Sequence, residues 1–326
     1  MYTSDSTISE VEATSDIVVA AAFAATRPGF IMMTFVILFY GAYTIIFSLY
    51  GYLQAQQHGR NRYYQITVMF LYMLATTALV LAILEYNQEN LLLFSVVFNN
   101  AIGGAFFDPV VQAHFSAFES IDIAEAAVYV TANIIADALL LYRCYVVWGA
   151  RKYIILGPFL ISLTNTALGL AAAVLEQKSS DRILIAVAAN LGENASLKAV
   201  SAISTSFLAV NLVTNIVLTG LIAGRIWWIS QETRRSLPGV GGKNLNSIVA
   251  MILESGSLYP VALAICLGLN KANTEASIEP VLTVIVGMAP TLIMVRADLG
   301  ISVQINSDEK DLELHESRIL SPYPRF

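Results

Sequence analysis

The chain has 326 residues, of which 56% are hydrophobic and 13% charged, and its formal net charge is −6. Soluble globular domains carry about 25% charged residues, so this composition excludes an ordinary soluble domain and predicts an all-α, polytopic membrane protein. The negative net charge gives no indication of nucleic-acid binding. The two cysteines, Cys144 and Cys266, lie in different predicted spans and near opposite faces, so we expect no disulfide between them. No Cys/His cluster has metal-ligand spacing, and we expect no metal and no cofactor.

Seven apolar segments are long enough to cross a bilayer as helices. Residues 1–29 are predicted to be an extracellular or lumenal segment that lacks the basic region of a signal peptide. Residues 30–299 form the predicted seven-transmembrane-helix bundle, and 300–326 a polar, disordered tail. The predicted spans are 30–53, 66–84, 126–148, 153–175, 200–224, 246–269 and 280–298.

A further apolar segment, 91–107, is almost long enough to span. An Asn-Asn pair and a Gly-Gly pair interrupt it, and Pro109 follows its end. Glycine and proline weaken a helix, so we expect a re-entrant or surface-lying loop that covers the outer end of the bundle.

The basic residues predict the orientation. With seven spans, ten Lys and Arg fall on one face and five on the other before the tail is counted. The positive-inside rule then places the N-terminus outside and the C-terminus in the cytoplasm of a plasma membrane or endomembrane. Asn194 begins an Asn-Ala-Ser glycosylation motif, and this topology places it on the lumenal side. The distribution of basic residues and the position of the glycosylation motif therefore predict the same orientation.

Polar residues inside the spans form two helical stripes. Asn133 and Asp137 share one face of the third span, and Ser204, Asn211 and Asn215 share one face of the fifth. A carboxylate near the centre of a span costs about 2.5 kcal/mol or more without a partner, so Asp137 is expected to face the bundle interior. The stripes indicate either interhelical hydrogen bonds or the lining of a ligand cavity or ion path.

Three charged residues are predicted to share a depth in the cytoplasmic third: Arg143, Glu254 and Arg296. A buried charge there requires a partner, so we expect Glu254 to pair with one of the two arginines, most naturally Arg296 of the adjacent span. Pro260 and Pro290 are expected to kink spans six and seven. The cluster is either a static clamp or a lock that opens when span six moves.

Three motifs carry a resemblance to a known family. They are Asp-Ala-Leu-Leu-Leu-Tyr-Arg-Cys-Tyr-Val-Val-Trp-Gly at 137–149, Glu-Ser-Gly-Ser-Leu-Tyr at 254–259, and Ala-Pro-Thr-Leu-Ile at 289–293, the last followed by Arg296 and Gly300. Together they resemble an uncharacterised family of seven-transmembrane proteins from basidiomycete fungi. The resemblance covers spans three to seven. It implies a receptor-like seven-helix architecture, and it implies no particular activity and no catalytic residues.

A looser resemblance is to G-protein-coupled receptors. Tyr142-Arg143-Cys144 is similar to their acidic-Arg-Tyr triplet, and the two span prolines are similar to their kinked sixth and seventh helices. This chain departs from that pattern because no acidic residue precedes Arg143 and no cysteine lies at the outer end of span three. A G protein therefore stays an open question as the cytoplasmic partner.

Other seven-span classes lack their required residues. Span seven has no lysine for a retinal Schiff base, and the three histidines, His58, His114 and His315, all fall outside the predicted spans. We therefore expect no enzyme. Two hypotheses remain: a receptor-like sensor of a small molecule or lipid bound between spans three, five and six, or a transporter or channel that uses Asp137 and Glu254. A structural membrane protein is a third alternative.

Overall fold

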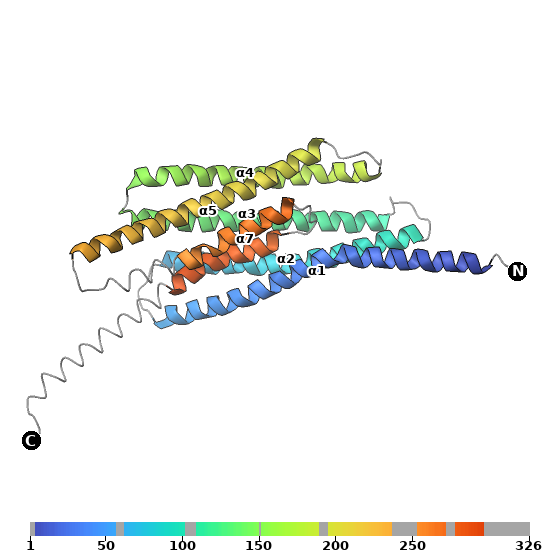
Figure 1. Ribbon diagram of the computed structural model, residues 1–326, viewed down its shortest axis with the longest axis horizontal. Coiled ribbons are helices and arrows are strands. Elements are labelled where there is room, and N and C mark those ends of the chain that lie inside the picture. Colours follow the sequence, from blue (N-terminus) through green and yellow to red (C-terminus); the bar gives the residue numbers. More distant parts are fainter. Residues whose placement is uncertain are drawn as a thin grey trace, which may run out of the picture.

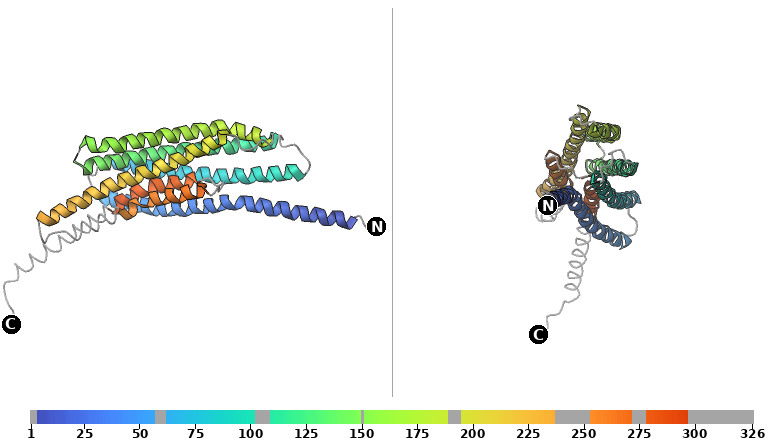
Figure 2. Two further views of the ribbon diagram at one scale, coloured as in Figure 1. Left: turned by 45° about the horizontal axis from the view of Figure 1, so that its top comes forward. Right: turned by 90° about the vertical axis from the view of Figure 1, so that its right-hand side faces the viewer.

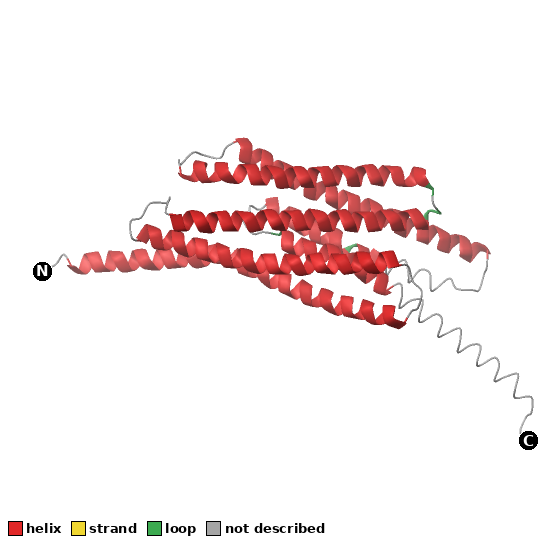
Figure 3. Cartoon of the chain, turned by 180° about the vertical axis from the view of Figure 1, so that it is seen from behind, coloured by secondary structure: helices red, strands yellow, loops and turns green. Residues whose placement is uncertain are grey.

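The computed structural model describes the backbone of residues 4–56, 62–101, 109–149, 151–188, 195–236, 253–271 and 278–296. It describes the side chains within 26–55, 62–96, 109–149, 151–175, 202–229, 231–232, 253–269 and 278–296. The fold is all-α across these ranges, which contain no strand (Figure 3). The helices are α1 (Ser4–Gln56), α2 (Arg62–Ala101), α3 (Pro109–Val147), α4 (Lys152–Ala188), α5 (Ala195–Ser236), α7 (Leu258–Lys271) and the 279–296 helix (Glu279–Arg296).

Six of these helices are long and apolar enough to cross a membrane. A seventh apolar segment, Leu253–Leu269, is shorter. Six of the seven predicted spans fall within single helices over most of their length, and residues 246–252 of the remaining span, 246–269, lie outside the described residues. Asn194 and the tail 300–326 also lie outside them.

The helix α4 illustrates how the bundle suits a lipid environment. Its outward side chains are apolar, with Leu156, Phe159 and Leu160 each half exposed or more, whereas its buried side chains include Ser162 and Asn165. A water-soluble helix has the opposite arrangement, with its polar face outward. This pattern and the length of the apolar helices identify a membrane-embedded protein.

Two predicted boundaries are wrong. Segment 91–107 was predicted to be a loop, but α2 continues as a helix through residues 91–101. Residues 102–108 lie outside the described part. The stretch from Arg62 to Ala101 contains no proline, and its Asn-Asn pair is accommodated in the last turn. Similarly, α1 begins at Ser4 and runs through Pro28, so residues 4–29 extend the first span as one helix. Pro28 removes one backbone hydrogen bond, and the apolar segments on both sides keep the helix continuous.

Consecutive helices run antiparallel along the length of the molecule (Figures 1 and 2). Helix α3 lies against α2, α4 and α5, and α7 lies against α5. Because the helices alternate in direction, the N-terminal ends of α2 and α4 lie at the same end of the molecule as the C-terminal ends of α3, α5 and the 279–296 helix. This end carries cationic side chains, and we call it the basic end. Its cations are Arg62, Arg143, Arg151, Lys152, Arg225 and Arg296.

The end of the bundle opposite the basic end is acidic. Glu85 follows Arg62 by 23 residues on α2 (85 minus 62), which is a rise of about 35 Å. The hydrocarbon core of a bilayer is about 30 Å thick, so the two charged levels lie on either side of one membrane thickness. The acidic level contains Glu85, Glu89, Glu119, Asp122, Glu125 and Glu279.

The 279–296 helix is the centre of the bundle. Every residue from Pro280 to Thr291 is buried, as expected for a helix that is apolar on all sides. Tyr43 of α1 packs onto it beside Gly287, where a Cβ atom would lie 3.0 Å from the tyrosine ring. The Tyr43 hydroxyl also lies 3.4 Å from the Thr291 hydroxyl. Close packing here depends on the missing side chain of Gly287.

Candidate functional site

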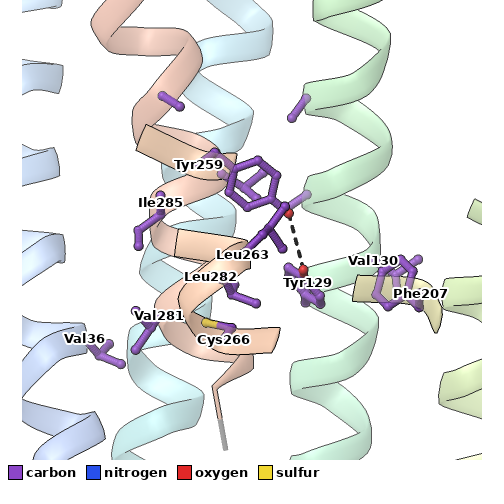
Figure 4. Close-up of a cluster of buried hydrophobic side chains, with 14 of the residues drawn as sticks. Val36, Tyr129, Val130, Phe207, Tyr259, Leu263, Cys266, Val281, Leu282 and Ile285 are labelled. Carbon is purple, nitrogen blue, oxygen red and sulfur yellow. Dashed lines mark hydrogen bonds between the residues drawn. The ribbon is translucent and has the colours of Figure 1, made fainter. Parts of the chain in front are cut away.

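A buried hydrogen-bond network joins four helices in the middle of the bundle. Its side chains come from α3 (Tyr129, Asn133), α4 (Asn165), α5 (Asn211, Asn215) and α7 (Tyr259), and each is less than 5% exposed. In Figure 4 the hydroxyl groups of Tyr129 and Tyr259 face each other between α3 and α7, 3.3 Å apart. Polar groups this deep must satisfy one another because neither water nor lipid can do so.

Asn211 is the hub of this network. Its amide nitrogen donates to the Tyr259 hydroxyl at 2.7 Å and to Asn133 Oδ1 at 2.9 Å, and lies 3.2 Å from the Tyr129 hydroxyl. Its Oδ1 accepts from Asn215 at 2.9 Å and from Asn165 at 3.3 Å. Both ends of one carboxamide are therefore used, and α3, α4, α5 and α7 are held in a single relative arrangement.

Tyr259 completes the ring of bonds. Its hydroxyl donates to Asn133 Oδ1 at 2.6 Å while it accepts from Asn211. Asn133 in turn donates to the backbone carbonyl of Tyr129 at 3.0 Å. Tyr259 lies in the first turn of α7, so α7 cannot shift relative to α3 and α5 without breaking these bonds.

Asp137 faces the bundle interior as its depth predicted, and it is 3% exposed. Ser162 of α4 donates to its Oδ2 at 2.9 Å. Asn165 is a second hydrogen-bonding side chain beside it, and Asn165 also reaches Asn211. Asp137 is thus joined to the network through α4, which is the helix on which the sequence analysis named no site residue.

The sequence stripes contain part of this network. Asn133, Asp137, Asn211 and Asn215 are brought together, while Ser204 lies two turns from Asn211, is half-buried, and forms no hydrogen bond to it in the described structure. The sequence analysis missed four members of the network: Tyr129, Ser162, Asn165 and Tyr259. Three sequence features could have indicated them. They are the i, i+4 spacing of Tyr129 and Asn133, the i, i+3 spacing of the polar pair on α4, and the tyrosine directly before Pro260.

Among the three charged residues predicted to cluster, Arg296 and Glu254 form an ion pair. Arg296 Nη1 lies 2.8 Å from Glu254 Oε2. The side chains are 29% and 71% exposed, respectively, so Glu254 is not the buried carboxylate that its depth from residue 246 suggested. Arg143 lines a cavity between α2, α3, α5 and the 279–296 helix.

The two span prolines behave differently. The helix before α7 is interrupted at Ser257, whose backbone N–H bonds to the Leu253 carbonyl at 2.9 Å and whose Oγ donates to the Glu254 carbonyl at 2.9 Å. Pro260 has no N–H for the Gly256 carbonyl, which explains an interruption here. The 279–296 helix, in contrast, is continuous through Pro290.

Two adjoining cavities lie between the network and the basic end. The larger has a volume of about 250 Å³ and is bordered by Arg143 and Tyr64 among mainly apolar side chains. The smaller, of about 20 Å³, is bordered by Asn215 and Tyr259. Both are lined by a shared set of side chains, so they adjoin. The shared side chains are Leu140, Thr219 and Ile293.

The acidic side has a smaller cavity of about 50 Å³, which Gly29, Glu85 and Glu89 border. Between it and the network lies an apolar cluster that includes Leu263, Leu282 and other side chains shown in Figure 4. Within the described residues, no group of three or more His, Cys, Asp and Glu side chains could hold a metal ion.

In comparisons with known proteins, no family model, no curated protein and no solved structure matches this chain.

Proposed function

We propose that the protein is a seven-span, receptor-like membrane sensor of a small, lipid-like molecule. The observation that carries the proposal is that the cavity of about 250 Å³ shares three lining side chains with the smaller cavity, which the network residues Asn215 and Tyr259 border. A molecule in the larger cavity contacts Leu140, Thr219 and Ile293, the side chains that also border the space beneath Tyr259. Binding and the arrangement of α7 are therefore coupled through shared contacts.

The cavity lining defines the ligand class. It is mainly apolar, with Tyr64, Arg143 and Thr219 as its polar members. A guanidinium has five N–H donors and favours an acidic or strongly accepting group. Drug-sized sites have volumes of about 300–1,000 Å³, so a cavity of about 250 Å³ suits a compact amphiphile with one acidic group.

The response passes through Gly256. A Cβ atom at Gly256 would lie 2.7 Å from Thr219 Cγ2, so α5 and the segment before α7 are in direct contact. A ligand that displaces Thr219 must displace this segment as well, because close-packed side chains transmit movement. This segment is interrupted at Ser257, and an interruption in the helical hydrogen bonds is a position at which a helix can bend.

The alternative is a transporter or channel that uses Asp137 and Glu254. The burial of Asp137 in a polar network favours it. The apolar cluster on the acidic side of the network disfavours it, because Leu263 and Leu282 are at most 1% exposed and close the path in this conformation.

A pair of variants on α3 tests the site. Leu140→Phe enlarges a side chain that borders both cavities, whereas Ile134→Phe enlarges one that is 40% exposed on the outer face. In nanodiscs, amphiphiles with one carboxylate should raise the unfolding temperature of the parent and of Ile134→Phe. Leu140→Phe should weaken their binding at least tenfold. Equal binding to both variants would exclude this cavity.

Proteoliposome flux separates the two hypotheses. A sensor should pass no protons or small ions above the level of empty vesicles. Proton or solute flux that disappears in Asp137→Asn would replace the sensor with the transporter hypothesis.

The proposed orientation has its own test. In a eukaryotic secretory system Asn194 should be glycosylated and a tag after Phe326 should be accessible only from the cytosol. A tag exposed on the outside would contradict the seven-span arrangement.

A further inference from the structure

An aromatic and cationic cluster lies at the basic end, apart from the cavities. Arg225 of α5 is stacked between two indoles, with its Cζ atom 4.5 Å from the Trp228 ring centroid and 5.2 Å from that of Trp148. Trp148 follows the last turn of α3, so the cluster joins the ends of α3 and α5. Stacking fixes the plane of the guanidinium, and its N–H donors point outward in that plane.

Two donors in this cluster have no acceptor. Arg225 Nε and Trp148 Nε1 are both buried and, within the described structure, neither has a hydrogen-bond partner. A buried donor without an acceptor is destabilising, and such groups are rare. Two of them in one cluster indicate that an acceptor outside the chain binds here.

The surroundings of the cluster are positively charged. Arg151 and Lys152 follow Trp148 across the turn at Gly149, which has a φ of 63°, and both are exposed. Ile155 of α4 packs into the same apolar cluster as Trp148, so the start of α4 lies beside it. The single carboxylate on α5, Glu232, lies two turns beyond Arg225. An acceptor with negative charge is therefore favoured.

We propose that this cluster binds the phosphate of an anionic phospholipid headgroup. Arg225 and the Trp148 indole donate to phosphate oxygens, and Arg151 and Lys152 add charge at the rim. The adjoining surface of α4 suits acyl chains, because its outward side chains are apolar: Leu156 is 57% and Leu160 is 53% exposed. Tryptophan beside basic residues is also the composition found where helices leave a bilayer. A soluble phosphate would share the headgroup contacts but not the acyl contacts.

The test uses the full chain in phosphatidylcholine nanodiscs with increasing phosphatidylglycerol, and native mass spectrometry measures lipid retention. Arg225→Gln should lower the apparent affinity for phosphatidylglycerol about fivefold, the effect of one cation at a membrane surface. Trp148→Phe keeps the aromatic ring but removes the N–H, and should lower it about twofold to tenfold. Arg151→Gln with Lys152→Gln leaves the stacked side chains untouched and should lower it more than Arg225→Gln does.

The matched control is Arg62→Gln, which removes an exposed cation from the same end but from α2, and it should leave retention unchanged. An equal loss in Arg62→Gln would mean diffuse surface attraction and would overturn the site. Unchanged affinity in all cluster variants would overturn it too. If inorganic phosphate displaces phosphatidylglycerol and stabilises the parent but not Arg225→Gln, the cluster binds a soluble anion and the lipid assignment fails.

Discussion

The most informative perturbation is Asn211→Ala, because it removes the hub of the polar network and leaves the surrounding apolar residues in place. Four well-formed hydrogen bonds disappear, to Tyr259, Asn133, Asn215 and Asn165. An interhelical hydrogen bond in a membrane protein contributes about 0.6 kcal/mol on average, which gives about 2.4 kcal/mol for the four bonds. A partner left buried without a bond adds about 1 kcal/mol or more. We therefore expect a loss of roughly 3 kcal/mol in the free energy of unfolding.

The assay is reversible unfolding in mixed detergent micelles, followed by far-UV circular dichroism. Asn87→Ala is the matched control, since Asn87 is exposed and its amide bonds only to the Ile83 carbonyl of its own helix, at 2.8 Å. This control should change stability by less than about 0.5 kcal/mol. If Asn211→Ala is as stable as Asn87→Ala, the network does not hold the four helices together and the coupling argument fails.

Two further pairs of substitutions test the packing and the ion pair. Gly169→Ala should destabilise by about 1–3 kcal/mol, because its Cβ atom would lie 2.9 Å from the Phe207 ring; Gly157→Ala on the same helix has open space and should be neutral or stabilising. Glu254→Gln and Arg296→Gln should each cost less than about 1 kcal/mol, because the pair is partly exposed. Double-mutant coupling above that value, or coupling that does not fall as salt is added, would contradict this.

The membrane spans could be predicted because a run of about 20 apolar residues has few other uses. Their ends were harder to predict. Segment 91–107 was interpreted as a loop from its asparagines and glycines, but a helix already supported by many turns tolerates an Asn-Asn pair, whose propensity cost is below about 1 kcal/mol per residue. Signals of this size rarely end a long helix. Proline carries a larger cost inside a helix, about 3 kcal/mol, and α1 nevertheless continues through Pro28.

The polar site could be predicted only in part. Depth along the chain is sufficient to infer that Asp137 turns inward, since exposure to lipid would be costly. Which helix supplies its partner depends on how each helix is rotated, and periodicity alone does not determine this when all faces are apolar. Ser162 and Asn165 were therefore missed. For Glu254, the predicted burial relied on residues 246–252 as the start of the span, whereas its side chain is 71% exposed.

The burial of the 279–296 helix has a consequence for biosynthesis. It is the most enclosed of the membrane helices, with 83% of its residues buried, yet the ribosome makes it after the other six. Tyr43 of α1 and Val68 of α2 pack in clusters to which this helix contributes Met288 and Met294, respectively, and they lack those contacts until it inserts. We therefore expect the earlier helices to be incompletely packed until insertion of this helix closes the bundle. A nascent chain that ends before Glu279 should therefore be a substrate for membrane quality control, even though every other apolar helix is already present.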